Sequence, residues 1–153
     1  MKAIRLTFMI LLVLAMIQTV SAQDTARTAT VVGVIGTAEV MPPQGSWTEA
    51  RPGISLPEGT IIRTAEGSKV IVSIDGRSMS ALVEMRDYTQ LIIAEMPPLE
   101  NQTRKTLLDL AIGNVLIKVK NLPSDQSKFE VRTPISYVGV RGTIFSISLK
   151  RAE

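Results

Sequence analysis

The chain has 153 residues, enough for one domain with its own hydrophobic core, and carries 17 basic against 14 acidic residues. It contains neither cysteine nor histidine, which excludes disulfides, thiolate or imidazole metal sites, a lipid-modified cysteine, and Ser-His-Asp or Cys-His catalysis. The basic residues are scattered among acidic ones, so we expect no nucleic-acid partner.

The first 22 residues have the three parts of a secretory signal peptide. Lys2 and Arg5 form the basic start, an uncharged apolar run covers residues 6–17, and small residues end at Ala22. The apolar run is shorter than the roughly 20 residues that a membrane-spanning helix needs. We expect cleavage between Ala22 and Gln23, a periplasmic or secreted location and no stable membrane insertion. The alternative is an uncleaved signal that anchors the chain.

Loss of this segment leaves 15 basic against 14 acidic residues, because two of the 17 basic residues lie in it. Residues 23–28 are polar and are predicted to form a flexible leader. Residues 29–150 are predicted to form a single all-β domain. Aromatic residues make up only 4% of the chain, so Val, Ile and Leu must build the core. Enrichment in β-branched residues favours sheets. The first predicted strand covers residues 30–40, with a bend or bulge at its glycines.

A turn-rich stretch follows this strand. It contains the single tryptophan, Trp47, and turns at Gly53 and Gly59, and it leads into a short strand that ends at Thr64. We interpret Trp47 as a lid over one edge of the core; the alternative is an exposed contact for a partner.

The strongest hairpin pattern lies in the middle of the chain. Apolar and polar residues alternate over 69–74 and again over 78–85. Between them lies Asp75-Gly76, a dipeptide favoured in two-residue type I′ turns because both positions need positive φ. Asp75 is therefore assigned to the turn rather than to acid–base chemistry.

After a further short strand over 88–94, residues 106–112 and 114–120 look like paired strands around Gly113. A helix over the same stretch is the alternative, because several of its apolar residues also share a face at helical spacing. The mid-segment glycine and the β-branched residues disfavour the helix.

The stretch 129–147 predicts a strand, a kink, a second strand, a tight turn and a third strand. Pro134, which follows Thr133, lacks a backbone donor and cannot lie inside a central ladder. We interpret Arg141 as tying the tight turn to a backbone carbonyl or to a nearby acid such as Glu130. The alternative is that its guanidinium holds a carboxylate of a partner.

The pattern amounts to about nine or ten short strands with turn signals roughly every 8 to 12 residues, as in a β-sandwich. A short β-solenoid stack of two sheets is the alternative architecture. Asp109 and Glu130 stand on predicted strands with no obvious catalytic partner. We therefore expect no enzymatic activity, no cofactor and no metal.

Three groups of residues resemble the FecR-type domain family, which comprises periplasmic domains of sigma-factor regulators and their stand-alone exported relatives. They follow the family patterns W…G..L..G..I.T, G-x-V and F-x-V-x-T-P…R-G-T-x-F. The matching residues are Trp47, Gly53, Leu56, Gly59, Ile62 and Thr64, then Gly113 and Val115, then Phe129, Val131, Thr133, Pro134, Arg141, Gly142, Thr143 and Phe145. Asp75-Gly76 falls where the family places its hairpin, and the resemblance extends roughly over residues 29–149.

The resemblance implies an all-β, non-catalytic periplasmic domain. In sigma regulators such a domain relays a signal from an outer-membrane receptor to a cytoplasmic sigma-binding head, and no such head precedes the signal peptide here. We therefore expect a stand-alone exported binding or scaffold module that contacts another envelope protein in signalling or assembly. Contact would use a sheet edge or the surfaces around Trp47 and Arg141. A module that binds glycan or cell-wall polysaccharide is the alternative.

Overall fold

The computed structural model describes residues 26–120 and 122–150, and this part of the chain is all-β. It has twelve strands and one short 3-10 turn, and none of its helices could span a membrane. The predicted all-β fold class is confirmed, whereas the predicted signal peptide (1–22) and residues 23–25 lie outside the described residues. The strands are β1 (Ala29–Ile35), β2 (Ala38–Met41), β3 (Thr48–Glu49), β4 (Ser55–Leu56), β5 (Ile61–Thr64), β6 (Lys69–Ile74), β7 (Ala81–Met85), β8 (Gln90–Glu95), β9 (Lys105–Val119), β10 (Lys128–Arg132), β11 (Tyr137–Val140) and β12 (Ile144–Leu149).

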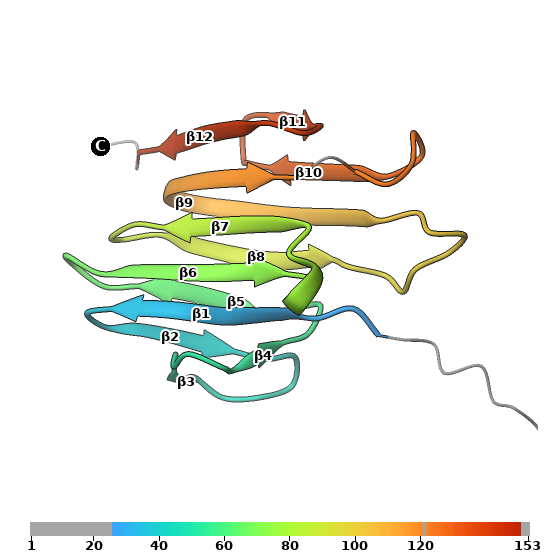
Figure 1. Ribbon diagram of the computed structural model, residues 1–153. Helices are drawn as coiled ribbons and strands as arrows, with labels where there is room; N and C mark the ends of the chain where they lie inside the picture. Colours follow the sequence, from blue (N-terminus) through green and yellow to red (C-terminus); the bar gives the residue numbers. More distant parts are fainter. Residues whose placement is uncertain (1–25, 121, 151–153) are drawn as a thin grey trace, which may run out of the picture.

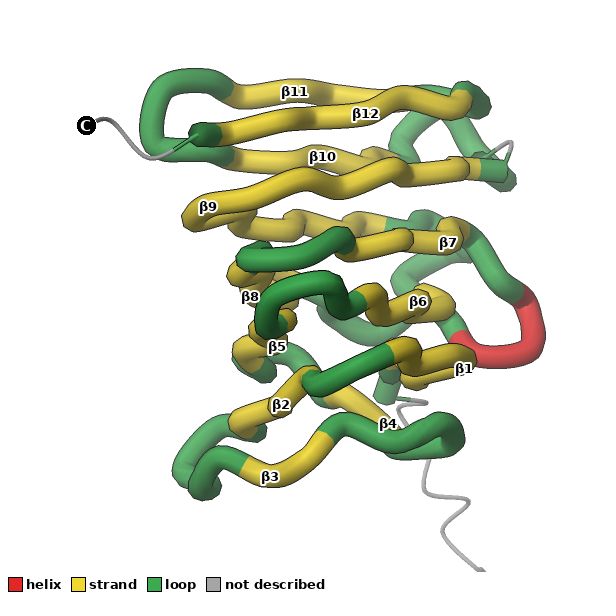
Figure 2. Tube along the Cα trace, turned by 90° about the vertical axis from the view of Figure 1, so that its left-hand side faces the viewer, coloured by secondary structure: helices red, strands yellow, loops and turns green. Residues whose placement is uncertain are grey.

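The strands are stacked in two facing sheets (Figure 1). Sheet A has the order β4, β1, β6, β7, the second half of β9, and β12. Sheet B has the order β3, β2, β5, β8, the first half of β9, β10 and β11. The chain crosses between the sheets at tight corners, from β1 to β2, β5 to β6 and β7 to β8, so each such pair forms an arch (Figure 2).

The core lies between the two sheets and consists mainly of aliphatic side chains. Alternation places every second residue of a strand inward, as in β6, where Val70, Val72 and Ile74 are buried. Phe129 is the largest fully buried side chain. The core therefore follows from the period-two pattern of β-branched residues that the sequence shows.

Strand β9 differs from the prediction. Its halves, predicted as strands paired around Gly113, form one continuous strand that bends from sheet B into sheet A and pairs with β8 and β7 instead. Gly113 has φ of 103°, and a Cβ there would lie 2.3 Å from Oγ1 of Thr89. Only glycine fits this corner. The helix alternative is excluded.

Hydroxyl groups satisfy the backbone at successive corners of the stack. The backbone N–H of Thr37 donates to Oγ of Ser68 (2.8 Å), that of Thr89 to Oγ1 of Thr64 (2.9 Å), and that of Asn114 to Oγ1 of Thr89 (2.9 Å). Unpaired buried backbone donors are costly, so each hydroxyl stabilises the corner beside it. This gives Thr64 a physical role in the fold.

The loop after β6 is longer than the predicted two-residue turn. Asp75 and Gly76 do have positive φ, 63° and 50°. However, a 3-10 turn over Gly76–Ser78 follows, the N–H of Ser80 donates to the carbonyl of Ile74, and β7 begins only at Ala81. The type I′ prediction is wrong, because the backbone hydrogen bond that closes the loop joins Ser80 to Ile74 and so encloses more than Asp75 and Gly76.

That carboxylate forms a buried ion pair with Arg27. The two side chains are 4% and 7% exposed, with Nε 2.6 Å from Oδ1, and a second guanidinium nitrogen lies 3.0 Å from Oδ2. The same nitrogen also donates to Oγ1 of Thr106 (2.8 Å). Arg27, which lies in the predicted leader over residues 23–28, is thus bound to the β6–β7 loop and to β9. Burial opposes ionisation of Asp75, but hydrogen bonding, chiefly from Arg27, together with the charges of Arg27 and Arg104 outweighs it and lowers the pKa of Asp75.

The two ends of the stack are unlike each other. At one end, here called the capped end, the segment 42–60 with β3 and β4 folds over the core and buries Ala50 and Leu56. At the other, here called the open end, β11 and β12 are the last strands of their sheets (Figure 2). Phe145 points inward there but is only half-buried.

Gly113→Ala is expected to destabilise the protein by at least about 3 kcal/mol, since it combines a left-handed backbone with a steric clash. Urea unfolding followed by circular dichroism measures the change. Gly139→Ala is the control, because nothing lies within 4 Å of a Cβ at that position. Equal stability of the two variants would contradict the corner geometry.

Asp75→Asn is expected to cost about 3 kcal/mol at neutral pH, because it leaves a buried guanidinium uncompensated. The folded pKa of Asp75 is lowered, so its stabilisation is present above the ordinary carboxyl pKa and disappears as the pH falls through the folded value. The difference in unfolding free energy between the protein and the variant should therefore shrink on acidification. Asp109→Asn, at an exposed pair, is the control and should change little.

Candidate functional site

A row of six outward-facing residues crosses sheet B. Cross-strand register places each directly opposite the next on β2, β5, β8, β9, β10 and β11. Every member is half-buried or exposed. Successive side chains of a strand point to opposite faces, so the neighbours of each member within its strand point into the core. This set, called the sheet B row, consists of Met41, Ile61, Ile92, Asp109, Arg132 and Tyr137.

Charges in the sheet B row are paired across strands. Arg132 binds Asp109 in a bidentate arrangement, with Nε–Oδ1 at 2.7 Å and Nη2–Oδ2 at 2.6 Å. The hydrogen bond and charge of Asp109 raise the pKa of Arg132. Next to this pair, the Tyr137 hydroxyl donates to Glu130 at 3.1 Å, and burial followed by this hydrogen bond raises the pKa of Tyr137. Arg132 is therefore charged and Tyr137 neutral at physiological pH.

Trp47 adds an aromatic surface to the same face. The guanidinium carbon of Arg63 lies 3.8 Å from the centroid of the Trp47 ring, and Arg63 donates to Glu39 at 2.7 Å. Arg63 is on β5, next to the sheet B row, so the ring packs over the outer side of sheet B. One face of the indole is thus covered by a cation, and the residue is half-buried.

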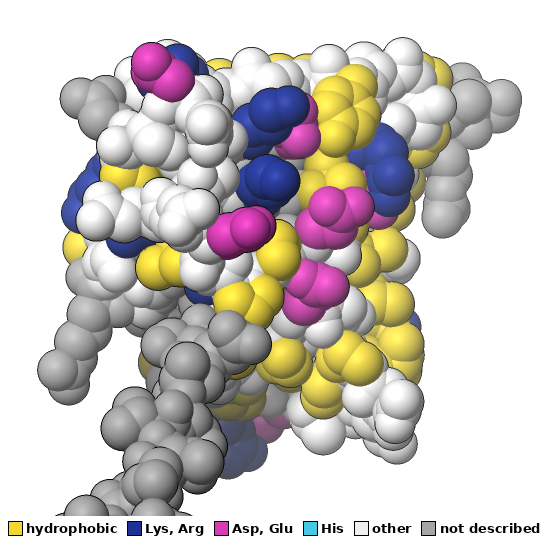
Figure 3. Space-filling view, turned by 90° about the vertical axis from the view of Figure 1, so that its right-hand side faces the viewer, with side chains coloured by type: hydrophobic (Ala, Val, Ile, Leu, Met, Phe, Trp, Pro, Cys, Tyr) yellow, Lys and Arg dark blue, Asp and Glu magenta, His cyan; other side chains and the backbone are white. Residues whose placement is uncertain are grey.

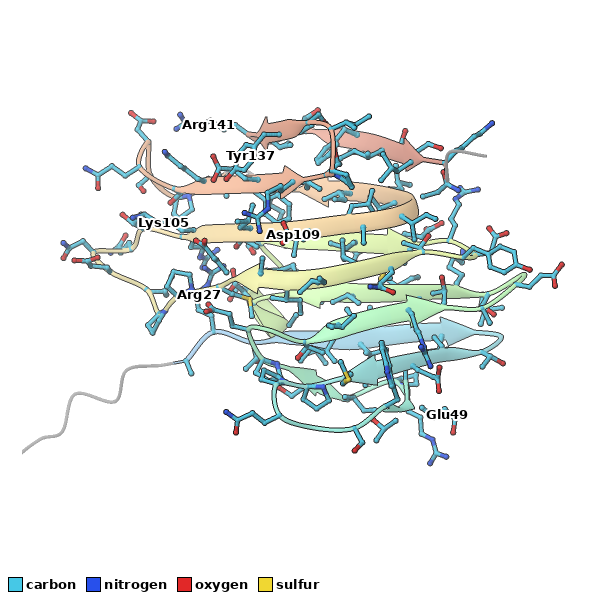
Figure 4. All side chains as sticks on the ribbon, turned by 180° about the vertical axis from the view of Figure 1, so that it is seen from behind. Arg27, Glu49, Lys105, Asp109, Tyr137 and Arg141 are labelled. Carbon is cyan, nitrogen blue, oxygen red and sulfur yellow. The ribbon has the colours of Figure 1, made fainter. Side chains whose placement is uncertain are left out.

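Arg141 lies far from this aromatic group. It stands between β11 and β12 at the open end, whereas Glu49 of β3, two residues after Trp47, lies at the capped end (Figure 4). Arg141 donates to Asp125, and both side chains are exposed. The acid that ties the turn is therefore Asp125 rather than the expected Glu130, which is hydrogen-bonded to Tyr137. The structure does not bring the two predicted binding residues together.

The other motif residues shape turns. Thr133 Oγ1 accepts the N–H groups of Ser136 (2.9 Å) and Ile135 (3.3 Å), which closes the turn that contains Pro134. The Thr143 carbonyl accepts the N–H of Val119 (2.9 Å). The motif glycines with positive φ are Gly53, Gly59, Gly76, Gly113 and Gly142.

The arrangement offers a surface for recognition. Among the described residues no group of three or more acidic side chains is placed to hold a metal ion. Hydrophobic and charged side chains are interleaved along one margin of the stack when it is seen from the side opposite the corners (Figure 3). Mixed apolar, aromatic and arginine side chains are typical of protein interfaces.

Sequence analysis missed Arg63, Arg132 and Tyr137 as members of this surface. Alternation along their strands marks them as outward-facing. Their alignment, however, depends on the register between strands that are far apart in the chain. No local signal could have found it.

Residues 48–153, well over half of the chain, match the family described as FecR protein. No curated protein and no solved structure matches the chain.

Arg63→Ala is expected to shift the fluorescence of the single tryptophan to longer wavelength, because removal of the guanidinium exposes the ring face to water. Acrylamide quenching should increase in parallel. Arg51→Ala, at an exposed pair with Glu49, is the control. An unchanged spectrum in the Arg63 variant would contradict the stacked geometry.

Proposed function

The chain belongs to the FecR protein family, a family of signalling regulators, and on this basis we propose that it is an exported, non-catalytic module of the cell envelope. In this proposal it regulates signalling by binding another protein through the outer face of sheet B. The observation that carries the proposal is the sheet B row, which spans six strands and lies beside Trp47 and Arg63.

The composition of this face supports binding to a protein. Tyrosine, tryptophan, methionine and arginine are enriched in interfaces, and each occurs here on a strand of sheet B or beside it. Ile61 and Ile92 supply apolar area between the two charged clusters. Burial of these half-exposed side chains by a partner provides the driving force.

Paired charges support specificity. Arg132 with Asp109, and Arg63 with Glu39, are held at fixed positions by short hydrogen bonds. A partner must present complementary charges at matching positions, because a misplaced like charge costs several kcal/mol. These carboxylates are neutralised by arginine, which also argues against a role for them in acid–base catalysis.

Export is supported by the start of the sequence. Residues 1–22 combine a basic start, a short apolar run and small residues before Gln23. Binding of polysaccharide has less support, because Arg63 covers one of the two ring faces that Trp47 could offer to a sugar.

Site-specific photo-cross-linking in the producing cell tests the proposal. A benzophenone amino acid at Ile92, the centre of the sheet B row, should give an adduct with one envelope protein. The same group at Lys118, on the exposed outer side of sheet A, is the matched control and should not. No adduct at Ile92, or the same adduct at both positions, would contradict the proposed surface.

Affinity for the cross-linked protein then tests individual side chains. Trp47→Ala and Arg132→Ala should each weaken binding at least about tenfold, as expected for aromatic and arginine anchors. Lys118→Ala should leave the affinity unchanged. Loss of binding in all three variants would point to damaged folding, which circular dichroism would reveal.

A further inference from the structure

The last strands of both sheets at the open end are unprotected edges. Within the described residues, β11 pairs only with β10 and β12 only with β9. Neither Tyr-Val-Gly-Val in β11 nor Ile-Phe-Ser-Ile-Ser-Leu in β12 contains a charged residue or a proline. Natural edge strands usually carry such residues to prevent pairing with another chain.

The side chains behind these edges are apolar and incompletely covered. Phe145, Ile147 and Leu149 lie opposite Ile117, Val115 and Gly113, so they point into the core, yet all three are half-buried. Val138 of β11 is half-buried in the same way. The capped end, in contrast, buries Leu56 completely beneath its loops. The open end therefore has both free hydrogen-bonding groups and apolar area.

We propose that the open end binds the open end of a second copy of this chain, with β12 pairing with β12 and β11 with β11. A two-fold axis perpendicular to the sheets reverses the strand direction and keeps each sheet on its own side. One such axis therefore makes both pairs antiparallel at once, and both sheets continue from one copy into the other.

A register centred on Ile147 fits this arrangement. It places Phe145 of one copy opposite Leu149 of the other, and Ser146 opposite Ser148. Inward residues then meet inward residues, and serines meet serines on the outside. Phe145, Ile147, Leu149 and Val138 of both copies become a shared core.

The second copy is favoured over an unrelated extended segment for two reasons. A single segment would complete only one of the two edges, whereas another copy presents both at the matching separation (Figure 2). The edge strands carry no charged residue, so the same edges of two copies can pair without electrostatic repulsion. They also offer no charge pattern that would select a different partner. Tyr137 of the sheet B row lies on the edge strand β11, but the two proposals are tested separately, because Ile92 and Trp47 lie away from both edges.

The molar mass of the exported protein in solution, measured by light scattering after gel filtration, tests the pairing. We expect a dimer. Ser146→Lys with Ser148→Lys places like charges opposite each other across the interface and should raise the dimer dissociation constant at least tenfold. Ser46→Lys, an exposed serine at the capped end, is the matched control and should remain dimeric.

Charge complementation makes the test specific to this interface. A second variant, Ser146→Glu with Ser148→Glu, should likewise dimerise at least tenfold more weakly when alone, but an equimolar mixture of the two charged variants should form heterodimers. A monomeric unmodified protein, or charged variants that stay dimeric, would overturn the proposal. So would monomeric variants whose mixture does not associate.

Single cysteines locate the contact, since the chain has none of its own. An equimolar mixture of Ser146→Cys and Ser148→Cys should form an inter-copy disulfide on mild oxidation, because this register places residue 146 of one copy directly opposite residue 148 of the other. Ser46→Cys should not. Cross-linking at residue 46 in place of residue 146 would show that a different surface associates. The benzophenone adduct at Ile92 reports on the proposed function separately.

Discussion

The changes of sheet at Thr37, Thr89 and Asn114 depend on corners whose backbone N–H groups must be satisfied without a regular ladder. Hydroxyl groups of Ser68, Thr64 and Thr89 accept the corner N–H groups, and each comes from a neighbouring arch. The arches are thus connected through their corners as well as through their strands. Gly113 lies at the last of these corners, where Thr89 leaves no room for a side chain. With the corners fixed, the two sheets face each other and the aliphatic residues between them form one core.

The same geometry sets up the recognition surface. Because the arches are in register, outward residues on β2, β5, β8, β9, β10 and β11 fall into one line. Aliphatic residues occupy one half of that line, and the Asp109–Arg132 pair followed by Tyr137 occupies the other. Pairing with a second copy through the open end would place two such lines on the same side of a longer sheet. A partner with two equivalent sites would then bind with avidity.

Alternation and turn residues in the sequence predict the all-β class, most strands and the strand–turn–strand–turn–strand order over 129–147. Two predictions failed where a local pattern has two structural meanings. A glycine between amphipathic halves suits a hairpin or a corner, and only pairing with β7 and β8 shows that Gly113 is a corner. Asp-Gly suits either a two-residue type I′ turn or the start of a longer loop, and here a 3-10 turn over Gly76–Ser78 lengthens the loop. The alignment of Arg132 with Asp109 likewise depends on parallel pairing between β9 and β10, which no local window contains.

The ion pair between Arg27 and Asp75 also lies where tension on the N-terminal side of the domain would first be felt. Arg27 precedes β1 by two residues and is bound to a loop 48 residues further along the chain and to β9. Tension applied to the chain at residue 26 is therefore borne first by a desolvated guanidinium–carboxylate contact, before any hydrogen bond of β1 is stretched.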